Sequence, residues 1–177
     1  MNDLVKVGLG GGCHWCTEGV FNSLKGVHHV EQGWIASTKP YDSWSEAVIV
    51  HFDPAVIRLS HIIEIHLHTH SSTSDHHLRS KYRSAIYYTA HNESLTIKSI
   101  LKEFENTELK QLVTLPLPLS KFKMNKEEYL DYLYTNPESQ FCIRYIHPKL
   151  MQLMKRYDAS MDLDKLKHLG IVPIEDK

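Results

Sequence analysis

Three consecutive glycines at positions 10–12 constrain the fold of this chain more than any other feature of the sequence. The segment before them, residues 4–9, partly alternates between apolar and polar residues, as a β-strand does. After them, apolar residues recur every four positions, which predicts a helix from about Trp15 to Lys25. Because glycine lacks a side chain, the backbone between the strand and the helix can turn sharply. The chain is therefore expected to begin with a strand, a tight turn and a helix.

Two cysteines, Cys13 and Cys16, follow the glycines in a C-x-x-C pattern where this helix begins. Free N–H groups and the positive end of the helix dipole lower the pKa of a cysteine there and favour the nucleophilic thiolate. Residues three apart share one side of a helical turn, so the two thiols can approach disulfide distance. The pattern predicts a redox site. Two alternatives stay open, namely small buried residues, or half of a zinc site completed by Cys142 and histidines.

The rest of the chain alternates predicted strands and helices, without a repeat, a low-complexity block or a linker. This alternation predicts a single domain over residues 1–177 of the α/β (α+β) class with a mixed sheet, its core about 4–156 and its C-terminal tail 157–177. The expected strands are residues 27–35, 47–52, 83–88 and 112–115, followed by a Leu-Pro-Leu-Pro loop, and the expected helices begin at Ser60 and Asn92 as N-caps, at Asn125 with Glu128 as a capping box, and at Pro148.

Charge and hydropathy exclude several functional classes. Lysine and arginine number 20 against 21 acidic residues, which gives a net charge of −1, so no overall positive field attracts nucleic acid or an anionic membrane. No apolar run approaches the roughly 20 residues of a membrane span. The first residues lack the basic and apolar blocks of a signal peptide, which predicts a cytoplasmic location. Three cysteines do not form a secreted disulfide framework.

The glycine turn and the C-x-x-C pair resemble the signature of the peptide methionine sulfoxide reductase A family. The signature of that family, Gly-Cys-Phe-Trp followed by Gly or Cys, stands here as Gly-Cys-His-Trp-Cys at positions 12–16. The resemblance implies a ferredoxin-like two-layer plait with extra segments. It also implies reduction of the S epimer of methionine sulfoxide, free or in proteins. It continues through Lys25-Gly26-Val27, Gly33-Trp34, Glu46-Ala47-Val48, Phe52-Asp53-Pro54, Tyr82-Arg83-Ser84-Ala85-Ile86-Tyr87, Asn136-Pro137, Phe141-Cys142 and Pro148-Lys149-Leu150.

The resemblance assigns roles to individual residues. The thiolate of Cys13 attacks the sulfoxide sulfur. Glu46 matches the acid of a His-Ala-Glu-Val motif, and partial burial would raise the pKa of Glu46 and keep it protonated. Tyr82 matches a tyrosine that binds the sulfoxide oxygen. Trp15 matches a wall of the pocket for the substrate methyl group. Tyr41 matches a second tyrosine that binds the sulfoxide oxygen. This match is weaker, because the loop between Tyr41 and Glu46 is several residues shorter than in the family.

Two departures from the family pattern define the alternative function. His14 replaces a phenylalanine, which makes the methyl pocket more polar, and a protonated His14 would favour the Cys13 thiolate or weaken substrate fit. The family's Asp-x-Gly-x-Gln-Tyr run reads His-Leu-Arg-Ser-Lys-Tyr at 77–82, so His77 is expected to organise the catalytic water instead. The alternative is a divergent member that keeps the C-x-x-C pair for thiol redox chemistry or zinc binding, with reduced or lost sulfoxide reduction.

Recycling requires a second thiol, because the oxidised Cys13 would be a sulfenic acid. Cys16 is the expected partner and Cys142 the alternative, since residues 158–177 contain no cysteine. The resulting disulfide would be reduced by thioredoxin or a small thiol, with no bound cofactor. His66 and His70 lie four apart on an apolar helix face, where hydrogen-bonded core histidines are favoured over a metal site. We expect no metal, no nucleic acid and no membrane partner.

Overall fold

A six-stranded mixed sheet forms the centre of the computed structural model, which describes residues 4–171. The strand order is β5-β4-β1-β3-β2-β6. All neighbouring strands pair antiparallel except β4 and β5, which are parallel. The predicted α/β class with a mixed sheet is therefore confirmed. The strands are β1 (Val5–Gly10), β2 (Val27–Ala36), β3 (Ser45–Phe52), β4 (Ala85–Tyr88), β5 (Leu115–Pro118) and β6 (Lys121–Met124).

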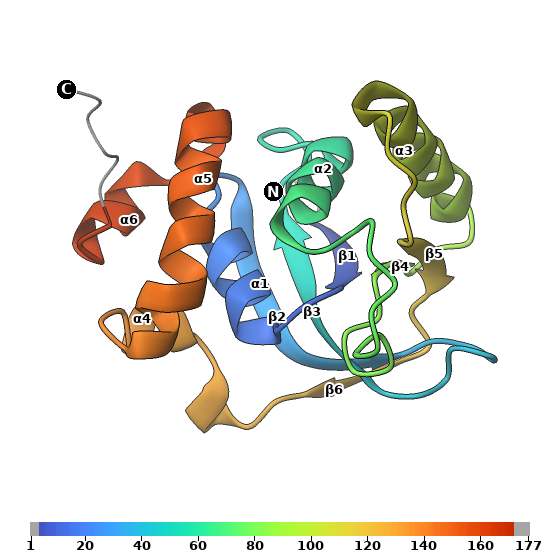
Figure 1. Cartoon of the computed structure of the whole chain (residues 1–177), viewed down its shortest axis with the longest axis horizontal. Helices are drawn as coiled ribbons and strands as arrows, with labels where there is room; N and C mark the ends of the chain where they lie inside the picture. Colours follow the sequence, from blue (N-terminus) through green and yellow to red (C-terminus); the bar gives the residue numbers. More distant parts are fainter. Residues whose placement is uncertain (1–3, 172–177) are drawn as a thin grey trace.

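The helices of the described chain pack on one face of this sheet and give the molecule two layers (Figure 1). The larger apolar cluster fills the space between the layers and joins residues from the strands with residues from the helices. Five α-helices were foreseen at least in part, and α6 was not. The bounds are α1 (His14–Asn22), α2 (Leu59–Thr69), α3 (Glu93–Glu108), α4 (Tyr132–Thr135), α5 (His147–Tyr157) and α6 (Leu163–His168), with a π-helical segment at Cys142–Ile146 and 3₁₀ turns at Glu127–Tyr129 and Asp158–Ser160.

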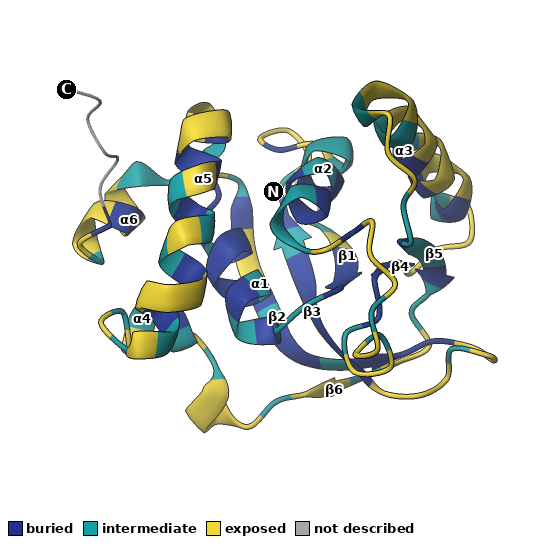
Figure 2. Cartoon of the chain, in the orientation of Figure 1, coloured by how far each residue is buried: buried dark blue, intermediate teal, exposed yellow. Residues whose placement is uncertain are grey.

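Side chains of the central strands alternate between two buried clusters, so that β3 is almost entirely buried and β1 and β2 are mostly buried in Figure 2. On β3, Val48 and Val50 belong to the cluster beneath the helices, whereas Ala47 and Ile49 belong to a smaller cluster on the opposite face. Because successive strand residues face opposite sides, Glu46 points toward the helices together with Val48. This alternation brings an acidic side chain to the layer that contains the two N-terminal cysteines.

The expected Leu-Pro-Leu-Pro loop is wrong, because Leu115–Pro118 forms the edge strand β5. Proline has no N–H group and is therefore tolerated on an edge strand when it faces away from the neighbouring strand. The flanking leucines supply the donors, since Leu115 N donates to Ser84 O at 3.0 Å and Leu119 N donates to Tyr88 O at 2.8 Å. Because every second residue is proline, the segment has the composition of a loop although it forms a strand.

The predicted helix starts at Ser60 and Asn125 are also corrected, whereas the helix start at Asn92 is confirmed. The helix α2 begins at Leu59, with Arg58 rather than Ser60 at its N-cap. Asn92 occupies the N-cap of α3 without a side-chain hydrogen bond, because Glu93 instead accepts the N–H groups of the preceding turn. Asn125 starts no helix, because its side chain is used in a contact with β2. The expected helix over 125–134 is split into a 3₁₀ turn and α4.

Within residues 4–171, no helix is both long enough and apolar enough to cross a lipid bilayer.

Candidate active site

The glycine turn ends β1 and places Cys13 at the N-cap of α1. Gly11 has φ of +150°, which side-chain-bearing residues rarely adopt, and a Cβ atom there would overlap the His70 ring. The ring is itself fixed: its Nδ1 donates to the His66 carbonyl at 2.6 Å, and its Nε2 pairs with Ser84 Oγ at 2.8 Å. The turn before Cys13 therefore needs glycine because a rigid histidine lies against it.

His66 and His70 are hydrogen-bonded core residues, as the sequence predicted. Their rings stack at 4.2 Å between centroids, and His66 Nε2 donates to the Gly10 carbonyl at 2.8 Å. Burial lowers the pKa of His66 to about 4 and the pKa of His70 well below its ordinary value, so both rings are neutral at pH 7. No group of three or more metal-ligating side chains occurs among residues 4–171, so nothing here favours the zinc alternative.

A cavity of about 340 Å³ opens beside Cys13. It brings together three segments that are far apart in sequence, from the start of α1, from the loop after α2 and from the π-helical segment with α5. Cys13, Cys16 and Tyr82 all line it, so the predicted nucleophile, its predicted partner and the predicted oxygen-binding tyrosine share one space. The other lining residues are Gly11, Gly12, Thr17, Val20, Thr69, His70, Ser71, His76, Leu78, Phe141, Tyr145 and Lys149.

The electrostatics of the two thiols are opposite. The Cys16 thiol donates a hydrogen bond to the Cys13 sulfur, and this bond is the main cause of the lowered pKa of Cys13. The N–H groups of Trp15 and Cys16 lower this pKa further, whereas burial and the charge of Glu46 oppose the effect. The same hydrogen bond, together with burial, raises the pKa of Cys16. Cys13 is partly exposed, whereas Cys16 is buried. Cys13 is therefore the thiolate of the pair and Cys16 its hydrogen-bond donor.

The Cys16→Ala variant should make Cys13 less reactive at neutral pH. Removing the largest cause of the lowered Cys13 pKa raises that pKa, so less thiolate is present at pH 7. We expect alkylation of Cys13 by iodoacetamide at pH 7 to slow at least about threefold, and its pH midpoint to move upward. Peptide mass spectrometry identifies the alkylated residue, and Cys142→Ala is the matched control. An unchanged midpoint in Cys16→Ala would exclude this activation.

Glu46 lies beside the cysteines but outside the cavity lining. Its side chain is 7% exposed, and its Oε2 accepts the backbone N–H of His14 at 3.1 Å. Its Oε1 lies 3.3 Å from the ammonium nitrogen of Lys81. The expected burial is present, and the buried carboxyl group also contacts the Lys81 ammonium group, which the family match did not indicate. The sequence offered no sign of this cation, because Lys81 is 35 residues further along the chain.

His14 is neutral and structural, which corrects the suggestion that a protonated His14 favours the Cys13 thiolate. Burial lowers its pKa, so its contact with Glu46 at 3.5 Å is not an ion pair at pH 7. Its Nδ1 donates to the Gly33 carbonyl at 3.3 Å, and its Nε2 accepts from Asn125 Nδ2 at 3.2 Å. The Asn125 amide also donates to Gln32 Oε1 at 2.8 Å. A buried polar network therefore replaces the apolar packing that a phenylalanine would provide.

This network continues to a second buried carboxyl. Gln32 Nε2 donates to Glu18 Oε2 at 2.8 Å, and Glu18 Oε1 accepts the backbone N–H of Asp131 at 2.9 Å. Burial raises the pKa of Glu18, although these hydrogen bonds oppose the effect. The segment around residues 125–131, which was expected to be helical, is thus attached to α1 and β2 by side-chain hydrogen bonds.

The His14→Phe variant, which restores the family residue, should destabilise the protein. Phenylalanine removes the hydrogen bonds that the His14 ring makes with the Gly33 carbonyl and the Asn125 amide, which costs about 1–3 kcal/mol. The backbone contact to Glu46 survives, so the acid stays in place. Urea unfolding followed by circular dichroism measures the loss, with exposed His91→Phe as the control. A stability equal to that of the control would show that the network contributes nothing.

Three other predicted residues lie away from the cavity. Trp15 stacks on Tyr132 at 4.1 Å between ring centroids and meets the edge of Phe141 at 5.3 Å, so Phe141 rather than Trp15 lines the cavity. His77 is exposed, and its neighbour His76 lines the cavity in its place. The methyl-binding wall and the water-organising role therefore stay predictions without support from placement.

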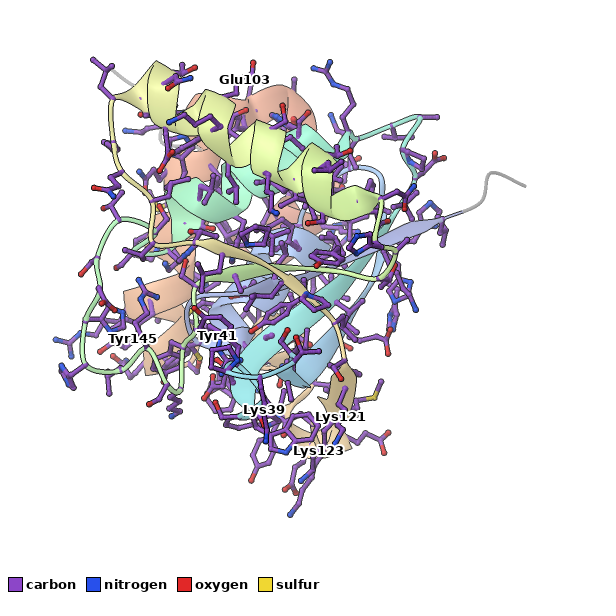
Figure 3. All side chains as sticks on the ribbon, turned by 90° about the vertical axis from the view of Figure 1, so that its right-hand side faces the viewer. Lys39, Tyr41, Glu103, Lys121, Lys123 and Tyr145 are labelled. Atoms are coloured by element: carbon purple, nitrogen blue, oxygen red, sulfur yellow. The ribbon has the colours of Figure 1, made fainter. Side chains whose placement is uncertain are left out.

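Tyr41 lies against the smaller apolar cluster, on the face of the sheet opposite Glu46. The loop that carries it folds back, since Ser37 N donates to the Tyr41 carbonyl at 3.1 Å and Tyr41 N donates to the Thr38 carbonyl at 2.8 Å. Figure 3 looks onto this loop and labels Tyr41. The guanidinium of Arg83 lies 5.7 Å from the centre of the Tyr41 ring. A short, closed loop thus keeps Tyr41 from the cavity that contains Tyr82.

Comparison with known proteins identifies the family. The family model described as peptide methionine sulfoxide reductase matches residues 5–161, which is most of the chain. The chain belongs to the peptide methionine sulfoxide reductase family. A protein of Psychrobacter sp. (strain PRwf-1) named peptide methionine sulfoxide reductase MsrA is 32% identical over 169 residues, covering 86% of this chain and 96% of the relative. The protein of the same name from Sulfolobus acidocaldarius is 29% identical over 163 residues, covering 84% and 93%.

Solved structures support the fold. Methionine sulfoxide reductase A of Corynebacterium diphtheriae superposes with a TM-score of 0.64 at 22% identity, covering 78% of each chain. Reduced Mxr1 of Saccharomyces cerevisiae gives 0.66 at 19% identity, covering 79% of this chain and 90% of that one. Mxr1 has also been solved in complex with Trx2, and that structure gives 0.59 at 17% identity, covering 72% and 84%.

Arg79 fixes the loop beside the cavity in this peptide methionine sulfoxide reductase family member. The sequence motifs did not indicate this role. Arg79 stands where the family run has glycine, and its guanidinium donates to the carbonyls of Gly11 at 3.3 Å, Tyr82 at 3.0 Å and Ser74 at 2.6 Å. A planar guanidinium with several donors suits such a cluster of carbonyls. The loop that carries Tyr82 is thus attached to the glycine turn that carries Cys13. No local sequence pattern signalled it, because the carbonyls that it contacts come from separate segments.

Proposed function

We propose that this family member reduces the S epimer of methionine sulfoxide, in proteins or free, by a thiol-dependent mechanism. The observation that carries the proposal is the Cys13 sulfur: it has a lowered pKa, lies at the N-terminus of α1 and lines a cavity with a second thiol in hydrogen-bonding reach. This arrangement suits attack by a thiolate on a small, electron-poor centre. The chemistry needs no bound cofactor, because an external thiol supplies the electrons.

The first step transfers the sulfoxide oxygen to Cys13. The thiolate attacks the sulfoxide sulfur, the oxygen takes up one proton, and methionine leaves. One thiolate, one sulfoxide and one proton thus give one sulfenic acid and one methionine. Tyr82 is the proposed hydrogen-bond donor to the oxygen, and Glu46 is the proposed acid.

The second step forms a disulfide. The Cys16 sulfur attacks the sulfenic acid sulfur of Cys13, and the hydroxyl group leaves as water with the proton of the Cys16 thiol. Cys16 supports this role better than Cys142, because it already donates a hydrogen bond to Cys13 whereas Cys142 is fully buried in the π-helical segment. A thioredoxin-type dithiol or a small thiol then restores the pair. A cytosolic location is part of this proposal and stays a prediction.

Single-turnover reduction of the two epimers tests the function. The fully reduced protein is mixed with the S or the R epimer of a methionine sulfoxide peptide, without added reductant, and methionine and free thiols are counted. We expect methionine from the S epimer only, with loss of two thiols. Methionine from neither epimer, with all three thiols intact, would overturn the proposal. Methionine with loss of one thiol would leave the reductase and remove Cys16 from the resolving step.

A further inference from the structure

Lys81 lies between the two groups proposed to act on the sulfoxide oxygen. Its Nζ is 3.3 Å from Glu46 Oε1 and 5.0 Å from the centre of the Tyr82 ring. Its side chain is 51% exposed, whereas that of Glu46 is 7% exposed. The ammonium group thus reaches from solvent to a buried carboxyl, over the face of the tyrosine that lines the cavity. In the family run described above, this position is a glutamine.

The backbone of residue 81 is held independently of its side chain. The Lys81 carbonyl accepts the N–H of Glu46 at 2.9 Å and the hydroxyl of Ser45 at 2.9 Å. Ser45 Oγ in turn accepts the N–H of Arg83 at 2.8 Å. These bonds attach the segment before β4 to the start of β3, on both sides of Tyr82. A substitution of the Lys81 side chain therefore leaves the position of the loop intact.

The charge of Lys81 suits the chemistry of the site. Negative charge develops on the sulfoxide oxygen as the thiolate attacks, and fixed donors or cations near that oxygen lower the barrier. A carboxylate cannot supply this, whereas an ammonium group can. The contacts of Lys81 with Tyr82 and with Glu46 raise the pKa of Lys81, so it stays charged at neutral pH. A positive charge beside a phenol also makes its O–H a stronger hydrogen-bond donor.

We infer that Lys81 is a positioning residue for sulfoxide reduction: its ammonium group, held by Glu46 over the Tyr82 ring, makes the Tyr82 hydroxyl a stronger donor to the sulfoxide oxygen and adds positive charge beside it. This inference rests on the proposed function and on the proposed role of Tyr82. It also explains how a chain that lacks the aspartate of the family run can still stabilise the oxygen.

Single-turnover kinetics with the S epimer at pH 7 test the inference. We expect Lys81→Met to slow methionine formation about tenfold, which corresponds to about 1.4 kcal/mol, and Lys81→Arg to stay within about threefold of wild type. In a Tyr82→Phe background, Lys81→Met should change the rate by less than about twofold, because the group through which it acts is gone. Lys98→Met, on an exposed position of α3, is the control for removing a surface charge.

Each outcome decides the matter. An active wild type with an unchanged or faster Lys81→Met variant overturns the inference alone, because the ammonium group would then contribute nothing to the reaction of the sulfoxide. An equal loss in Lys81→Met and Lys81→Arg overturns it too, since the positive charge would not be the active feature. A full tenfold loss in the Tyr82→Phe background excludes action through the hydroxyl. A wild type that forms no methionine from the S epimer overturns the proposed function, and this inference with it.

Discussion

The Cys13→Ser variant is expected to form no measurable methionine from the S epimer, a loss of at least about a thousandfold in the single-turnover rate. Serine preserves the shape of the side chain, but its hydroxyl is not ionised at pH 7 and accepts no oxygen from a sulfoxide. The partly exposed Cys13 sulfur is the one thiol of the described chain whose pKa is lowered. Cys16 and Cys142 are buried with raised pKa values and cannot replace it.

The Cys16→Ser variant should behave differently, because Cys16 acts only after methionine has left. With no added reductant we expect one methionine per protein molecule and a sulfenic acid on Cys13, trapped by dimedone. The first turnover should stay within about tenfold of wild type, since the serine hydroxyl can still donate to the Cys13 sulfur. Multiple turnover with thioredoxin should fall sharply. Cys142→Ser is the matched control and should recycle normally. Equal multiple turnover of Cys13→Ser and wild type would remove Cys13 from the mechanism.

Local sequence patterns predicted the parts of this site that depend on local geometry. The glycine turn, the helix start and the C-x-x-C spacing together placed Cys13 and Cys16 on one turn of α1. This prediction succeeded because helix periodicity fixes side-chain direction within a few residues. Glu46 was identified by the family motif alone, and its direction toward the helices became clear from the structure. Tyr82, which lines the cavity, was also identified only by its position in the family motif.

What the sequence did not predict depends on contacts between distant segments. Nothing near Glu46 indicated that Lys81 would pair with it, and nothing near Asn125 indicated that its amide would reach His14 rather than cap a helix. Tyr41 matched the family only approximately, and a loop closed by its own backbone hydrogen bonds keeps it on the far face of the sheet. Such outcomes follow from tertiary packing, which overrides local propensity.

Substitutions at the glycine turn should separate the demands of backbone and packing. Gly11→Ala places a methyl group at φ of +150° and against the His70 ring, whose two ring nitrogens are both engaged. The ring cannot move without losing a hydrogen bond, so the turn must shift instead. We expect the free energy of unfolding to fall by about 2–4 kcal/mol. Because the same turn carries Cys13, the single-turnover rate should also fall at least about tenfold.

The adjacent glycine supplies the matched control. At Gly12, φ is not in the left-handed region, and the nearest atom to an added Cβ is His70 Cβ at 4.0 Å, an ordinary van der Waals contact. Gly12→Ala should therefore change stability by less than about 1 kcal/mol and leave the midpoint of Cys13 alkylation in place. Urea unfolding and single-turnover kinetics on both variants make the comparison. If Gly11→Ala is as stable and as active as Gly12→Ala, then the histidine ring does not hold the turn, and the geometry of Cys13 must be set by α1 alone.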